Sequence, residues 1–148
     1  MLKKLTYFCL LLVLFSCRND DDNAATASCT DNGSCDRCIR ISNELYHQTN
    51  TMYYNIENAS LNGDCLEITI GAGGCNGETW DIELVDSGSI IETGVPQRTL
   101  KIKFESSELC EAYLHKTISF NLKSIQLANY SEIGLLLSGY EDVIFYEY

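Results

Sequence analysis

Hydrophobic and polar residues alternate with a period of two along most of the chain beyond residue 52. Leu66, Ile68 and Ile70, for example, alternate with Glu67 and Thr69. Such alternation places apolar side chains on one face of a strand and polar side chains on the other. The pattern predicts about seven strands, over residues 53–60, 66–70, 80–84, 100–104, 118–122, 133–137 and 143–148.

Turn-forming residues separate these runs, at 62–64, 71–77, 86–88, 94–96 and 139–142. Several short strands joined by regular turns predict an all-β fold, here a β-sandwich. The polar alternate positions indicate sheets with one solvated face, which favours antiparallel pairing. One short helix is predicted over 107–114, with Ser106 or Ser107 as its cap.

Cys65 and Trp80 favour an immunoglobulin-like general architecture, because Cys65 opens one strand and Trp80 lies about one strand further on. Immunoglobulin domains carry a tyrosine two residues before the second strand cysteine, whereas this chain has Glu108 before Cys110. The prediction for residues 35–148 is therefore a sandwich of immunoglobulin-like general architecture rather than a true immunoglobulin domain.

The first 16 residues have the pattern of a targeting segment. Lys3 and Lys4 precede an apolar run from Leu5 to Phe15. As a helix this run would be only about 16 Å long, roughly half of a bilayer core. It is therefore typical of the hydrophobic region of a signal peptide and too short for a spanning helix.

The end of the run, Leu14-Phe15-Ser16-Cys17, resembles the lipobox of bacterial lipoproteins, although many lipoboxes carry a smaller residue in place of Phe15. The Phe-Ser-Cys ending is similar to those of Bacteroidota lipoproteins. The resemblance implies that residues 1–16 are removed and that Cys17 receives lipid. The expected partner is therefore a membrane, which the protein would contact through the lipid on Cys17. The alternative is an ordinary secretory signal in which Cys17 is incidental.

Residues 17–34 lack apolar periodicity and are expected to form an acidic flexible tether. Asp20, Asp21 and Asp22 resemble the surface-export signal of Bacteroidota lipoproteins. The alternative is a solvated spacer that charge repulsion keeps extended. Since Arg18 follows Cys17, the aspartate of the enterobacterial retention signal is absent at that position. The expected location is the outer membrane, with the domain at the cell surface.

The chain has 148 residues and a net charge of -11, and removal of residues 1–16 with their two lysines would leave 132 residues and a charge of -13. So acidic a chain is a poor partner for nucleic acid, whose phosphates require a basic surface.

Six cysteines remain besides Cys9 and Cys17, and an even number in an oxidising compartment predicts up to three disulfides without fixing their connectivity. These candidates are Cys29, Cys35, Cys38, Cys65, Cys75 and Cys110.

The Cys35-Asp36-Arg37-Cys38 segment is compatible with structural disulfides, a zinc half-site or a redox pair. Structural disulfides are favoured, because the βαβ context of a redox motif is missing and exported thiolates oxidise. Cys65 and Cys75 are not expected to pair. If 66–70 and 80–84 form a hairpin, Cys75 lies at its tip, about 17 Å from Cys65. Each would then pair with Cys110 or an N-terminal cysteine.

No catalytic residue, metal ligand or cofactor is predicted. The glycine-rich segment 71–77 lacks the spacing and the following helix of a phosphate-binding loop, so an ordinary loop is favoured. Neither histidine, His47 or His115, lies in a nucleophile motif. Carboxylates such as Glu67 are interpreted as part of a solvated sheet face, although a glycosidase-type acid pair stays open.

Eight tyrosines follow Cys17, and they suit either strand packing or recognition of a glycan or protein. The predicted function is that of a non-enzymatic recognition or accessory lipoprotein. The alternatives are a carbohydrate-processing or other hydrolytic accessory lipoprotein, and a structural subunit of an envelope complex.

Overall fold

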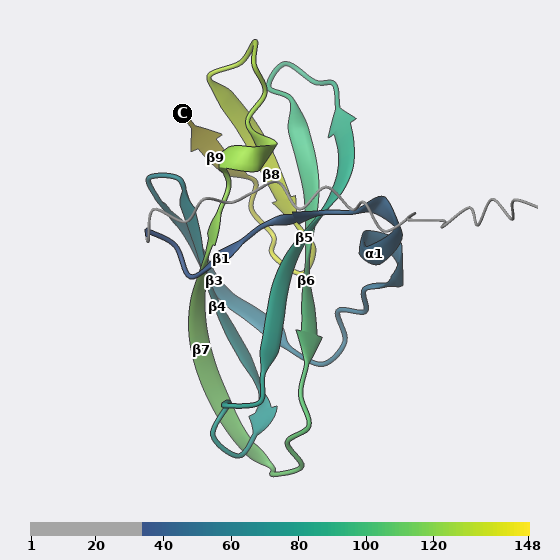
Figure 1. Ribbon diagram of the computed structural model, residues 1–148, viewed down its shortest axis with the longest axis vertical. Coiled ribbons are helices and arrows are strands. Elements are labelled where there is room, and N and C mark those ends of the chain that lie inside the picture. The colour runs from purple at the N-terminus through teal and green to yellow at the C-terminus, as the bar shows by residue number, and fades with distance from the viewer. Residues whose placement is uncertain (1–33) are drawn as a thin grey trace, which may run out of the picture.

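The computed structural model describes residues 34–148, which form a sandwich of two β-sheets (Figure 1). The proposed lipidation site Cys17, the candidate Cys29 and the export-signal candidates Asp20, Asp21 and Asp22 lie outside the described residues. The all-β sandwich predicted from the alternation pattern is confirmed.

Four strands form the first sheet in the order β1-β7-β4-β3: β1 Arg37–Cys38, β7 Ala112–Asn121, β4 Cys65–Gly74 and β3 Asn55–Asn62. Five strands form the second in the order β2-β5-β6-β8-β9: β2 Arg40–Ile41, β5 Asp81–Ile91, β6 Gln97–Glu105, β8 Glu132–Leu137 and β9 Ile144–Glu147. The seven strands β3 to β9 correspond to the seven predicted runs. Helix α1, Asn43–Gln48, and a 3-10 turn at Lys123–Ile125 complete the described chain.

The sheets are mixed, so the expectation of purely antiparallel pairing is wrong. The pairs β1–β7, β2–β5 and β6–β8 are parallel. Alternation shows which face of a strand is buried but carries no information about the strand's direction. β6 and β8 run parallel because β7, which lies between them in the chain, belongs to the other sheet, so the chain crosses the sandwich twice.

The expected hairpin of 66–70 with 80–84 is also wrong. β4 pairs with β3 and β7 in the first sheet, while β5 pairs with β6 in the second. β4 continues through Gly74, so only the second half of the glycine-rich segment 71–77 is a loop. The chain moves from one sheet to the other there, which the hydrophobic period alone does not distinguish from a hairpin.

The core lies between the sheets and is built from the inward-facing alternate residues of both. It includes Leu66, Ile68 and Ile70 of β4, Ile82 and Leu84 of β5, Leu100 and Ile102 of β6, and Phe120 of β7, all at most 1% exposed. The phenol of Tyr54 is buried with them and donates a hydrogen bond to the Ile102 carbonyl at 2.8 Å. Burial raises the pKa of the Tyr54 hydroxyl to about 12, although this hydrogen bond opposes the shift.

The predicted helix over 107–114 is wrong. Residues from Ala112 belong to β7, and residues 106–111 form a loop whose Leu109 is 96% exposed. A disulfide at Cys110 and the hydrogen bonds of Glu108 hold that loop, as described below. Helix α1 forms elsewhere, where the Ser42 hydroxyl accepts a hydrogen bond from the Leu45 N–H at 3.2 Å and so caps the first turn.

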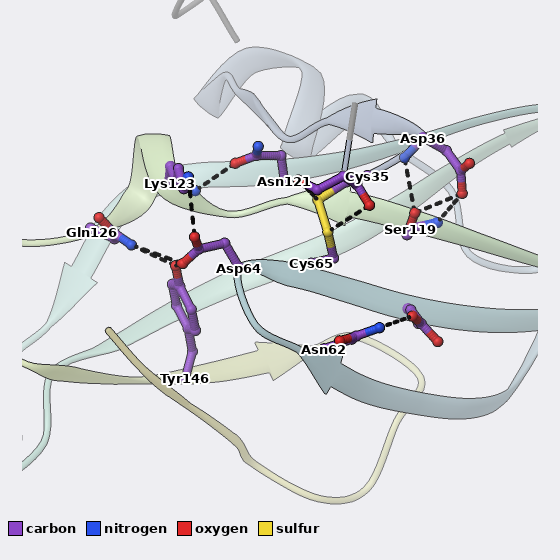
Figure 2. The surroundings of a disulfide bond; sticks show 12 residues. Cys35, Asp36, Asn62, Asp64, Cys65, Ser119, Asn121, Lys123, Gln126 and Tyr146 are labelled. Atoms are coloured by element: carbon purple, nitrogen blue, oxygen red, sulfur yellow. Dashed lines mark hydrogen bonds and ion pairs between the residues drawn. A yellow bond between two sulfur atoms is a disulfide. The ribbon is translucent and has the colours of Figure 1, made fainter. Parts of the chain in front are cut away.

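At one end of the first sheet, the Cys35–Cys65 disulfide joins the segment before β1 to the start of β4 (Figure 2). Next to Cys65, Asp64 accepts a hydrogen bond of 2.6 Å from the Tyr146 hydroxyl of β9. This bond is the main reason that the pKa of the Asp64 carboxyl is lowered. We call this region, which contains Cys35, Asp64, Cys65 and Tyr146, the joint end.

Within residues 34–148, no helix is long and apolar enough to cross a membrane.

Candidate functional site

The candidate site lies at the opposite end of β4, which we call the loop end. β4 runs nine residue steps from Cys65 to Gly74, so the two ends are about 30 Å apart at the usual rise of a strand. On the solvent face of the first sheet, Gly71 lies between Asn55 of β3 and His115 of β7. Gly73 lies beside Tyr113 of β7. Two glycines in the middle strand therefore leave a trough with side chains on either side.

Three side chains from the outer strands meet above Gly71. A register shift in β3 between Ile56 and Asn58 makes Glu57 an extra residue of that strand. One carboxylate oxygen of Glu57 lies 2.6 Å from His115 Nδ1, and the other accepts a hydrogen bond of 3.3 Å from the Tyr113 hydroxyl. The Asn55 amide donates to the same hydroxyl at 3.2 Å. Strands at both edges of β4 thus contribute to one polar cluster.

Gly71 is required for this arrangement because the polar cluster occupies the place of its side chain. A Cβ atom at residue 71 would lie 2.2 Å from the Tyr113 hydroxyl oxygen and 2.3 Å from a Glu57 carboxylate oxygen. Any other residue would therefore push both groups away. At Gly73, in contrast, the nearest atom to such a Cβ would be the Cys110 carbonyl oxygen at 4.0 Å, so the trough is open there.

The open part of the trough belongs to a pocket of about 550 Å³. It is lined by Tyr53, Gly73, Phe104, Glu105, Ser106, Glu108, Leu109 and Cys110. A smaller pocket of about 290 Å³ beside α1 shares Tyr53, Phe104 and Glu105 with it. Both volumes are in the range of small-ligand sites or somewhat below it.

Glu108 holds the rim of the pocket in place. Its carboxylate accepts backbone hydrogen bonds from Cys75, Asn76, Gly77 and Thr79, and a further one from the Thr79 hydroxyl. Desolvation by itself raises the pKa of this carboxyl, but the four backbone donors outweigh it and lower the pKa to about 2. Glu108 is therefore a permanent anion at neutral pH that fastens the loop before Trp80 to the loop before β7.

A disulfide between Cys75 and Cys110 ties the same two loops together. Both cysteines are exposed, unlike Cys35 and Cys65, and Cys110 is part of the pocket wall. The pocket is thus formed by loops that a covalent bond and five hydrogen bonds restrain, which limits the entropy that a ligand would have to remove.

Disulfides are present as expected, and Cys65 and Cys75 do not pair with each other. Cys65 bonds to the N-terminal Cys35 and Cys75 to Cys110. Cys38 is also disulfide-bonded. Cys35 and Cys38 therefore do not form the two-cysteine redox pair considered for their motif. Within residues 34–148, no group of three or more His, Cys, Asp or Glu side chains is placed to hold a metal ion.

The sequence did not indicate the cluster of Glu57, Tyr113 and His115. Glu57 and His115 are 58 residues apart and come together only through the pairing of β3, β4 and β7. The available signal was the position of Gly71 and Gly73 at alternate places on the solvent face of a strand, where β-branched or polar residues are usual. That signal was obscured by the interpretation of 71–77 as a loop.

No protein-family model matches the chain, and no curated protein matches its sequence. Two solved structures resemble its fold. One is a protein of unknown function, DUF1344, from Bacteroides vulgatus ATCC 8482, with a TM-score of 0.52 and 15% identity over 76% of this chain and 56% of that chain. The other is a NigD-like immunity protein from Bacteroides caccae ATCC 43185, with a TM-score of 0.56 and 12% identity over 74% of this chain and 57% of that chain.

Both likenesses concern the fold, and this chain spans somewhat more than half the length of each neighbour. Both neighbours come from Bacteroides.

Proposed function

We propose that this protein is a lipid-anchored recognition module of the outer membrane, exposed at the cell surface, which binds a ligand at the loop end without chemical conversion. The observation that carries the proposal is the open pocket of about 550 Å³ between restrained loops. It lies about 30 Å along β4 from the joint end, where Cys35 is bonded to Cys65. A domain anchored through Cys17 would be held by its joint end, with the pocket free.

The chemistry of the pocket supports binding over catalysis. Glu108 is occupied by five hydrogen bonds and has a pKa of about 2, so it is unsuited to donate a proton at neutral pH. The other carboxylate of the lining, Glu105, forms an ion pair of 3.1 Å with Lys103. Both acids therefore have structural partners. The hydrolytic alternative then rests on the Glu57–His115 pair, which is tested directly below.

The anchoring is tested on the full chain produced in a Bacteroidota host and labelled with a fatty-acid analogue. Wild type should be labelled, should sediment with outer membranes and should be cleaved by protease added to intact cells. Cys17→Ala should lose the label and the sedimentation. Replacement of Asp20, Asp21 and Asp22 by alanine should preserve the label and abolish surface cleavage. Labelling of the Cys17→Ala protein would contradict the lipoprotein assignment.

The absence of catalysis is tested by incubating the purified full chain with a broad panel of glycoside, ester and peptide substrates. We expect no turnover above that of a Glu57→Gln, His115→Asn double variant. Turnover by wild type that this variant loses would establish the hydrolytic alternative and overturn the proposal.

A second candidate function is immunity through recognition at the loop end, because one neighbour of similar fold is described as an immunity protein. Cells lacking the protein would then be inhibited by culture fluid from competing strains, and the wild-type gene would restore growth. A Gly73→Leu gene, which fills the pocket, should fail to do so, whereas Gly94→Leu should succeed. Gly94 is a suitable control since it also has open space around it and lies in the β5–β6 turn.

A further inference from the structure

We infer that the loop-end trough recognises an uncharged carbohydrate, with a sugar ring stacked on Tyr113. This inference rests on the proposed recognition function and names its ligand class. It is carried by the combination of an exposed aromatic ring, a polar cluster at its tip and the bare backbone of Gly71 and Gly73 beneath them.

The Tyr113 ring is exposed and yet held in place. Tyr113 is 52% exposed, while its hydroxyl is held by hydrogen bonds with Asn55 and Glu57. The His115 ring meets it edge-on, with centroids 5.3 Å apart and planes at 84°. Because the phenol tip lies where a Cβ of Gly71 would be, the ring lies low over the middle strand. A fixed aromatic surface costs little conformational entropy when a ligand packs on it.

The groups around the Tyr113 hydroxyl have unused hydrogen-bonding capacity. A carboxylate offers about four acceptor sites, and Glu57 uses two, for His115 and Tyr113. The Asn55 amide has a second N–H and a carbonyl oxygen, and His115 has a second ring nitrogen. No hydrogen bond to these remaining groups occurs within residues 34–148. Donors and acceptors beside an aromatic face match a sugar, which has an apolar C–H face and a rim of hydroxyls.

The charge of the site selects against acidic sugars. Glu105 and Glu108 line the pocket and Glu57 ends the trough, whereas no lysine or arginine is part of the pocket lining in the described chain. Two lysines of the same end already have partners, because Lys103 pairs with Glu83 and Glu105 and the Lys116 ammonium donates to the Gly77 carbonyl. A uronate would thus meet like charge, and the imidazole of the cluster, His115, is already paired with Glu57. The pocket that adjoins the trough at Gly73 has a volume of about 550 Å³, which leaves room for one or two sugar rings.

The test uses the purified full chain on an array of glucose, galactose, mannose and N-acetylglucosamine oligomers, together with uronic-acid oligomers of equal length. Wild type should bind at least one uncharged series and no uronate. Tyr113→Ala should weaken that binding about tenfold or more, because the stacking surface is lost. Tyr113→Phe, which keeps the ring, should lose less.

The matched control is Tyr130→Ala, since Tyr130 is 50% exposed and lies in the loop before β8. It should bind like wild type. Gly71→Ala should weaken binding as Tyr113→Ala does, because the added methyl displaces Tyr113 and Glu57. Thermal unfolding of each variant shows whether a loss of binding reflects a loss of folding.

Three results would overturn the inference: no binding to any uncharged glycan, stronger binding to uronates, or equal binding by Tyr113→Ala and wild type. These outcomes are separable from failure of the proposed function. In one case the protein is labelled and surface-exposed and Gly73→Leu abolishes an immunity phenotype, but no glycan binds. The proposed recognition function is then retained and the carbohydrate ligand is rejected. If glycans bind but Cys17→Ala is still labelled, the anchoring falls and the carbohydrate class stands.

Discussion

The joint end and the loop end are each closed by one disulfide, yet the two bridges have different consequences. Their sequence separations are similar, at 30 residues for Cys35–Cys65 and 35 for Cys75–Cys110. The chain-entropy model therefore assigns both nearly the same stabilisation, about 4 kcal/mol. Their surroundings differ: Cys35 and Cys65 are 8% and 5% exposed, whereas Cys75 and Cys110 are exposed.

The burial of each disulfide determines what it contributes beyond its effect on the entropy of the unfolded chain. At the joint end the neighbouring contacts, such as Tyr146 with Asp64, involve the fully buried core residue Tyr146 and connect the second sheet to the first. At the loop end the neighbouring contacts, such as Glu108 with residues 75–79, define the wall of an open pocket. Similar cross-links thus hold the fold together at one end and shape a surface at the other.

The largest expected effect is at the joint end. Tyr146 is fully buried, so Tyr146→Ala should lower the free energy of unfolding by about 3–5 kcal/mol through the cavity it leaves. Tyr146→Phe keeps the ring but loses the hydrogen bond that the hydroxyl donates to Asp64 and the one that it accepts from Gln126, which should cost about 1–3 kcal/mol. Urea unfolding measures both. Equal stability of the alanine variant and wild type would show that β9 is not part of the core.

Removing each disulfide in turn separates the two ends most directly. We expect each double variant to lose about 2–4 kcal/mol of the free energy of unfolding, because the two disulfides close loops of similar length. The first variant combines Cys35→Ala with Cys65→Ala, and the second combines Cys75→Ala with Cys110→Ala. Only the second pair should weaken ligand binding at temperatures where both variants are folded. Thermal unfolding and glycan binding measure the two effects. Loss of binding in the first pair alone would reverse the roles assigned to the ends.

The smallest expected effect is the pH dependence of the Glu108 contacts. The pKa of Glu108 is about 2 in the folded chain, below its ordinary value of 4.5. Because the pKa is lower in the folded chain, the ionised Glu108 carboxylate contributes its full stabilisation to the free energy of unfolding above about pH 4.5. This contribution disappears as the pH falls towards 2. Glu108→Gln should therefore lower Tm at neutral pH, with the difference from wild type shrinking over that interval.

The exposed Glu111→Gln in the same loop serves as the control for Glu108 and should follow wild type. A difference between Glu108→Gln and wild type that stays constant down to pH 2 would mean that the carboxylate's charge is not what holds the loops.

How far the sequence predicted this protein can be judged from particular residues. The alternation of Leu66, Ile68 and Ile70 located β4 and its buried face, and the six other runs were located in the same way. The helix over 107–114 was predicted from a spacing that suits a helix, but Leu109 has no core to pack against and Cys110 bonds to Cys75. Local periodicity cannot anticipate a bond to a residue 35 positions away.

The sequence by itself determined the all-β class, a part of each long strand and the pairing options of the cysteines, because these depend on local alternation and on composition. It also carries the lipobox-like ending at Cys17, which remains a prediction. Only the tertiary structure decided the sheet order, the parallel pairs and the meeting of Glu57, Tyr113 and His115 above Gly71. These depend on which strands become neighbours, a choice made by burying both sheets against one core and by contacts between residues far apart in the chain.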